Sequence, residues 1–273
     1  MRYVAPAREA VDPAVFGRPP LAGWGEFADL LQGPEWPSLD ALNARWPAGA
    51  RERFVAQTPE LLADGRHYEQ RIAHSGAIAT RERNWHDLFN ALVWLRHAPL
   101  KHALNAQQVL EVARVGPRQR SRPQCALTHF DEGGVILRVC DERLLALWDA
   151  HDWHGLFWRE RAAWTDGRLA LVVFGHALLE HGLTPDKLLV GKALALLGDD
   201  ETPACGLVAR AIEDGRVLRD PQELRPLPLS GVPGWHPDGD REAFHHHAPC
   251  YRPLRPGRRY PAPLALPRAR GRG

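Results

Sequence analysis

Apolar residues recur at helical spacing over residues 85–95, the most regular pattern in the chain. Their i, i+3, i+4, i+7 and i+10 rhythm predicts a helix with one face in a core, and the positions are Trp85, Leu88, Phe89, Leu92 and Leu95. Pro99 ends this helix and begins a second one that runs to Gly116. The short connection predicts two neighbouring helices, antiparallel or angled.

Prolines interrupt the first eighty residues, so only short helices are expected there. One is predicted over 37–46, where Ser38 can cap the helix and apolar residues recur at helical spacing. Two others are predicted around 26–31 and over 59–73. No repeat of fixed period is visible, which disfavours a solenoid.

The segment 126–139 predicts a β-hairpin. Two strand-like runs, "ALTHF" and "VILRV", flank "DEGG", and Gly133 and Gly134 accept the positive φ of a tight turn. Asp131 and Glu132 are then expected to be turn residues and not ligands.

Further elements alternate between helix and strand after the hairpin. Helices are predicted over 141–153, with Asp141 as the N-cap, and over 154–164. A buried strand, "LALVVF", leads directly into a helical turn, "GHALLEHG", and two more helices are expected at 185–197 and 203–214. The pattern predicts an α+β fold, mostly helical, with a small antiparallel hairpin or sheet and a Pro-rich irregular N-terminal segment.

Charge divides the chain into a domain and a tail. Seven arginines and no acidic residue follow position 251, which leaves 28 basic and 33 acidic side chains, a net −5, on residues 1–251. We expect an irregular N-terminus over 1–20, a single α+β domain over 21–251 and a disordered Arg/Pro-rich tail over 252–273. The tail suits weak contact with phosphates or no partner at all, and no other nucleic-acid contact is expected.

Cysteine use and hydropathy indicate the compartment. The four cysteines form no C-x-x-C pair, and the first residues lack the apolar run of a secretory signal. The longest apolar run, "LALVVFGHALL", is too short to span a bilayer. A cytoplasmic protein with no membrane partner is therefore predicted.

The stretch "RNWHDLFNALVW", residues 83–94, mixes polar side chains with core positions. Asn84 and Asp87 resemble a capping box, which explains both without any chemistry. His86 and Asn90 lie one turn apart on one face, where they either tie the N-terminal segment to the core or act as catalytic groups. In the functional reading, His86 is a general base or metal ligand that a carboxylate orients.

The junction "VVFGHALLE" is the second candidate. Gly175 permits a tight exit from the strand, and His176 then lies near a helix N-terminus. If His176 meets His86 and Asp87 in space, two imidazoles and a carboxylate make an acid/base cluster or a site for a divalent metal, the candidate cofactor. A satisfied core histidine is the structural alternative.

A histidine-rich segment, residues 235–250, is the third candidate. Its potential ligands match no zinc template and favour adventitious metal binding over a physiological site; they are His236, Asp238, Asp240, His245, His246, His247 and Cys250. Walker, G-x-S-x-G, H-E-x-x-H and G-x-G-x-x-G motifs are absent from the sequence.

Several motifs together resemble an uncharacterised bacterial family, common in proteobacteria and known only as a domain of unknown function. The resemblance spans roughly residues 30–255 and rests on "NWHDLFNALVW", "LKHALN", "FDEGGV", "GHALLE" and "GVPGW". It implies a cytosolic bacterial single-domain protein and brings no known activity, cofactor or partner.

Two functional hypotheses follow. The first is a ligand-binding or protein-interaction domain, in which the ten tryptophans are partly exposed and form a contact patch. The alternative is a hydrolase, metal-dependent or not, with His86, Asp87, Asn90 and His176 as catalytic residues in one pocket. The binding hypothesis is slightly favoured, because capping accounts for much of the polar helix.

Overall fold

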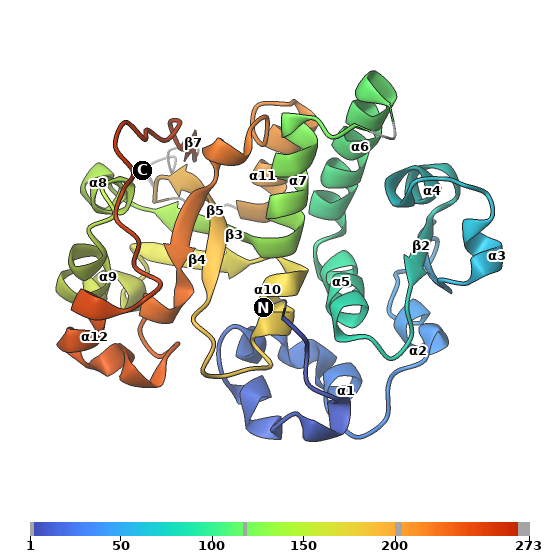
Figure 1. Ribbon diagram of the computed structural model, residues 1–273, viewed down its shortest axis with the longest axis horizontal. Coiled ribbons are helices and arrows are strands. Elements are labelled where there is room, and N and C mark those ends of the chain that lie inside the picture. The colour runs from blue at the N-terminus through green and yellow to red at the C-terminus, as the bar shows by residue number, and fades with distance from the viewer. Residues whose placement is uncertain (1–2, 117–118, 200–203, 267–273) are drawn as a thin grey trace, which may run out of the picture.

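The computed structural model describes residues 3–116, 119–199 and 204–266. The fold is α+β and mostly helical, as predicted, with a five-stranded and a two-stranded sheet (Figure 1). The α-helices are α1 (Ala28–Leu31), α2 (Leu39–Asn43), α3 (Pro59–Leu62), α4 (Tyr68–Ser75), α5 (Trp85–Arg96), α6 (Ala98–Val115), α7 (Arg122–Gly133), α8 (Glu142–Asp149), α9 (Arg161–Thr165), α10 (His176–His181), α11 (Ala204–Glu213) and α12 (Glu242–His247). The strands are β1 (Arg53–Ala56), β2 (Ala77–Thr80), β3 (Gly134–Val139), β4 (Leu169–Val173), β5 (Val190–Leu197), β6 (Arg225–Pro228) and β7 (Leu264–Ala265).

The N-terminal region consists of short turns, as its prolines predict. Three 3-10 helices, Arg8–Ala10, Pro13–Gly17 and Leu21–Phe27, precede α1, and Ser38 caps α2 by accepting a hydrogen bond from the Ala41 N–H. Strands β1 and β2 were not predicted. They pair in parallel and form a small sheet beside α4 (Figure 1).

The helix pair α5–α6 forms the centre of the helical layer. The Asn84 side chain accepts a hydrogen bond from the Asp87 N–H and so caps α5. Residues Leu88, Phe89 and Leu92 are at most 4% exposed, because α6 and α10 pack against α5. Gly116 ends α6, as predicted.

The predicted hairpin is wrong, because residues 122–133 form helix α7. Ser121 and Gln124 make a reciprocal capping box that starts this helix. Gly134 begins β3 with a φ of −68°, so the glycines do not supply a left-handed turn. Gly134 instead permits a close approach, because a Cβ there would lie 2.2 Å from the Phe130 carbonyl oxygen.

The main sheet is mixed, with the order β4-β3-β5-β6 and β7 beside β5. Strand β3 pairs antiparallel with β4 and parallel with β5. The helix predicted over 185–197 is therefore wrong, since 190–197 form β5. A short apolar run does not separate a buried strand from a buried helix, and the parallel pairing with β3 decides the outcome.

Helices cover the sheet on both sides. Helices α7 and α11 pack on β3, α7 also contacts β5, and α10 packs between α5 and α7. Figure 1 shows α8, α9 and α12 on the other side of the sheet, away from α5 and α6. Asp141 caps α8, as predicted, by accepting a hydrogen bond from the Leu144 N–H.

The C-terminal segment differs from the expected disordered tail as far as residue 266. Its strand β7 pairs with Leu196 and Leu197 of β5. Upstream, the Pro261 carbonyl accepts a hydrogen bond from Arg225, and the Tyr260 hydroxyl lies 2.8 Å from His151 Nε2. Residues 267–273 lie outside the described ranges.

Gly175→Ala tests the junction that carries His176. A Cβ at Gly175 would lie 2.4 Å from the Gly134 nitrogen, so we expect a loss of about 1–3 kcal/mol or more in the free energy of unfolding. Gly206→Ala in α11 is the control, because its Cβ would meet only Arg210, at 3.9 Å, and is expected to stabilise by about 0.5–1 kcal/mol. Urea unfolding measures both, and equal stabilities would contradict the close approach.

Candidate functional site

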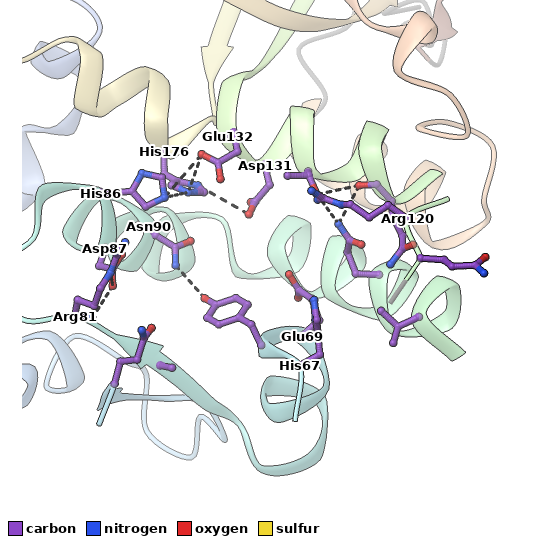
Figure 2. A pocket seen from close by; sticks show the side chains of 18 residues that line it. His67, Glu69, Arg81, His86, Asp87, Asn90, Arg120, Asp131, Glu132 and His176 are labelled. Carbon is purple, nitrogen blue, oxygen red and sulfur yellow. Dashed lines mark hydrogen bonds and ion pairs between the residues drawn. The ribbon is translucent and has the colours of Figure 1, made fainter. Parts of the chain in front are cut away.

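One cavity of about 490 Å³ contains the predicted site residues. Figure 2 shows it between the α4–β2 region and the helices α5 and α7. His86, Asp87, Asn90 and His176 all line it, as do Asp131 and Glu132. Most of the lining side chains are polar, so the cavity suits a polar ligand.

The two histidines meet directly. His86 comes from the first turn of α5, and His176 is the first residue of α10. Their Nε2 atoms are 3.1 Å apart, and the rings are nearly perpendicular, at 74°. His176 is only 4% exposed, whereas His86 is half-buried at the cavity wall.

Glu132 completes a group of three potential metal ligands. It lies near the C-terminal end of α7, and its Oε2 is 3.5 Å from His176 Nε2 and 3.8 Å from His86 Nε2. All three ligand atoms lie within 4.8 Å of one another. Two imidazoles and a carboxylate are a common ligand set for catalytic zinc.

A second layer of carboxylates faces the outer nitrogens of both rings. Glu180 Oε2, one turn further along α10, is 3.1 Å from His86 Nδ1. Asp131 Oδ2 is 3.9 Å from His176 Nδ1, which is buried without a hydrogen-bond partner among the described residues. Carboxylates in these positions orient metal-binding histidines and increase their basicity.

Proton placement constrains the histidine pair. Each Nδ1 faces a carboxylate, so each is the favourable position for a proton. With both Nδ1 atoms protonated and both rings neutral, two Nε2 lone pairs face each other across 3.1 Å and repel. This repulsion is relieved when one Nε2 carries a proton and donates it to the other, or when both nitrogens bind a metal ion.

The surroundings shift the pKa values of the three groups in different directions. The hydrogen bond with Glu180 raises the pKa of His86 despite its burial. Burial lowers the pKa of His176 to about 3, and burial raises the pKa of Glu132. His176 is thus neutral at pH 7, which is the form that binds metals.

A buried ion pair between Lys101 and Asp131 lies next to His176. Lys101 Nζ, on a side chain only 4% exposed, donates to Asp131 Oδ1 at 2.6 Å and to Asn90 Oδ1 at 2.8 Å. Asn90 in turn donates to the Tyr68 hydroxyl at 3.0 Å. Burial is the largest single effect on the Asp131 pKa and raises it, but the charge and hydrogen bond of Lys101 together with the two nearby histidines lower it overall, so an ionised carboxylate faces His176.

Asp87 has a structural partner inside the cavity wall. Its carboxylate accepts hydrogen bonds from Arg81, including one of 2.7 Å from Nη2. Only half of the expected capping box forms, because the Asp87 carboxylate turns to Arg81 and not to the Asn84 N–H. Asn90 likewise belongs to the Lys101 network and is not among the three potential metal ligands.

The sequence interpretation missed four acidic residues of the site. Asp131 and Glu132 lie in the segment for which the sequence wrongly predicts a hairpin turn. Glu180 follows His176 by four residues, a helical i,i+4 spacing that would have placed both on one face. Glu69, which also lines the cavity, lay in an N-terminal region with no strong pattern.

The histidine-rich segment separates into structural and surface residues. His245, 1% exposed, is fixed by the Gly239 carbonyl and the Tyr251 hydroxyl. His246, Glu242 and His154 form a second group of potential metal ligands. Two of its three residues are exposed, and the imidazole rings of His154 and His246 are stacked, with their planes at 16°.

The expected contact patch of an interaction domain depends on how far the ten tryptophans are exposed. Five are buried and five are partly buried, and none is exposed. In addition, no helix in the described part of the chain has the length and apolar character needed to cross a membrane.

The fold and this cluster define an α+β protein with a candidate metal centre. The chain belongs to the family described as "Protein of unknown function (DUF3025)", whose model matches residues 52–255. This match confirms the resemblance to an uncharacterised family, and the bacterial origin stays a prediction. The comparisons found no match among curated proteins or among solved structures.

Removing Lys101 tests the buried ion pair. Lys101→Met leaves the Asp131 carboxylate, 23% exposed, without its cation, and we expect a loss of about 3 kcal/mol in the free energy of unfolding. The double variant Lys101→Met, Asp131→Asn removes both charges and should recover more than half of that loss. Urea unfolding of the wild type and both variants measures these losses. An equal loss of stability in the single and the double variant would contradict the ion pair.

Glu69 should make stability depend on pH. Its carboxylate accepts a 2.6 Å hydrogen bond from Asn105, and burial raises its pKa to about 7 from 4.5. Because the folded-state pKa is the higher one, stability from this group is complete below pH 4.5 and is lost as pH rises to about 7. Glu69→Gln keeps an acceptor for Asn105. Relative to the wild type, the free energy of unfolding of this variant should be higher above pH 7 than at pH 4, by on the order of 1–3 kcal/mol. Unfolding curves at both pH values measure this, and a pH-independent difference would refute it.

Proposed function

We propose that this protein binds one divalent transition-metal ion, zinc in the first instance, through His86, Glu132 and His176. The observation that carries the proposal is the convergence of the two Nε2 atoms at 3.1 Å. Zn–N bonds of about 2.0–2.1 Å place two nitrogen ligands of a tetrahedral site about 3.3 Å apart. The separation of the two Nε2 atoms therefore suits two nitrogen ligands of one zinc ion.

We further propose that the centre hydrolyses a small polar substrate in the 490 Å³ cavity. A zinc ion with three protein ligands lowers the pKa of a bound water and polarises a carbonyl or phosphoryl group. Glu180 orients the His86 ring through its 3.1 Å contact with Nδ1, and the Asp131 carboxylate lies 3.9 Å from His176 Nδ1. The hydrogen-bonding side chains of the wall, Gln108 and Gln124 among them, would position the substrate.

Noncatalytic binding in the same cavity is the second candidate function. It is favoured because two of the lining carboxylates, Asp87 and Asp131, are neutralised by Arg81 and Lys101. Few acidic groups then remain for proton transfer besides Glu69 and Glu132. Metal bound without turnover would support this candidate over the hydrolase.

We also propose a cytoplasmic location, on the basis of the four free thiols in the structure. Partners stay unidentified. Weak contact between the arginine-rich C-terminal residues and phosphates is the one nucleic-acid contact that we propose.

Metal binding to variants of the untagged protein, purified without metal resin, tests the proposed centre. We expect one zinc per chain, with affinity at least about 100-fold lower in His86→Ala or His176→Ala and about 10- to 100-fold lower in Glu180→Gln. His246→Ala, which disrupts the surface group, is the matched control and should keep the affinity of the wild type. Zinc titration against a chromophoric chelator measures all four, and circular dichroism checks folding.

Loss of zinc in His246→Ala, or no stoichiometric zinc in the folded wild type, would reject the centre. Hydrolysis is tested separately, with chromogenic esters, amides and phosphate esters of small polar acids. Activity that a chelator removes and zinc restores, and that folded His176→Ala lacks, supports the hydrolase. Bound zinc with no turnover leaves noncatalytic binding as the function.

A further inference from the structure

A second pocket, of about 350 Å³, lies apart from the metal ligands. It is formed by the N-terminal segment around residues 15–19, the loop over 182–189 after α10, and the segment 230–240. Figure 1 shows that loop beside the blue N-terminal segment. Its size falls within the range of small-molecule sites.

Two cations of this pocket lack carboxylate partners among the described residues. Arg18 and Lys187 both line it, and the Lys187 ammonium lies over the Tyr3 ring, 4.3 Å from its centroid. The one carboxylate of the lining, Asp240, is already bonded to Arg161. The pocket therefore carries positive charge that an anion would neutralise.

Flat side chains make up much of the remaining wall. Trp235 and His236 line it together with three prolines, Pro19, Pro185 and Pro237. His236 is held in place, since its Nδ1 accepts from the Asp238 N–H and its ring stacks on Phe244. An indole face and rigid pyrrolidine rings favour a planar, partly apolar ligand.

A buried hydroxyl adds a specific polar contact. Ser230, 3% exposed, accepts a 2.9 Å hydrogen bond from the Leu189 N–H. Its hydroxyl keeps one hydrogen to donate, and the described residues offer no acceptor for it. A buried donor of this kind favours a ligand that carries an acceptor atom.

We propose that this pocket binds a small planar organic anion. Arg18 and Lys187 bind its carboxylate or phosphate, and its ring lies against Trp235. The site is separate from the proposed metal centre and does not depend on it. The two share helix α10, which carries His176 at its first residue and leads through Gly182 into the pocket.

Isothermal titration of the full chain tests the site with four probes. Adenosine 5′-monophosphate and 1-naphthoate carry a ring and an anion, whereas adenosine has only the ring and inorganic phosphate only the anion. At least one ringed anion should bind about tenfold or more tightly than adenosine and phosphate. Binding of the nucleotide but not of naphthoate would indicate a phosphate ligand. Binding of naphthoate but not of the nucleotide would indicate a carboxylate ligand.

The variants separate this pocket from the metal centre. All titrations are repeated in the His86→Ala, His176→Ala background, where affinity should be unchanged. Arg18→Gln, Lys187→Gln should weaken binding at least tenfold, as should Trp235→Leu, while the exposed Arg255→Gln is the matched control. Thermal unfolding checks that each variant folds. If Trp235→Leu does not fold, the double variant Arg18→Gln, Lys187→Gln still tests the site.

Three results would overturn the proposal. The first is that neither ringed anion binds with a Kd below about 1 mM. The second is that Arg18→Gln, Lys187→Gln binds as tightly as the parent. The third is that binding disappears in the metal-centre background, which would assign the ligand to the first cavity.

Discussion

The close approach of two backbone segments at Gly134 and Gly175 determines the geometry of the candidate metal centre. The Gly134 carbonyl accepts hydrogen bonds of 2.9 Å from the N–H groups of both Phe174 and Gly175. A side chain at either glycine would collide with backbone atoms. Since Glu132 lies two residues before Gly134 and His176 directly follows Gly175, the antiparallel pairing of β3 with β4 brings a carboxylate and an imidazole together.

The polar network behind the histidines is costly in an otherwise apolar helical layer. Removing Lys101 and Asp131 from water costs desolvation free energy, and a well-packed hydrophobic pair would often be as stable. The pair nevertheless fixes the charge and position of the carboxylate that faces His176. Orientation of the imidazole explains this network better than stability does.

Local signals in the sequence predicted much of the fold, and long-range pairing accounts for most of the errors. The caps Ser38, Asn84 and Asp141 were correct because a cap depends on neighbouring residues. Strand β5 was mistaken for a helix because its partner β3 lies fifty residues away. The sequence left open whether His86 and His176 meet in space, because the two residues are ninety positions apart, and Glu132 was lost with the incorrect hairpin.

The three proposed metal ligands also have a consequence for biosynthesis. Positions 86, 132 and 176 are each more than forty residues apart, so no short stretch of the emerging chain holds two of them. On the ribosome, the complete set exists only after β4 and α10 have been made and β4 has paired with β3. A metal ion would therefore bind only after this long-range packing has formed, and it would stabilise the folded state without guiding the early stages of folding.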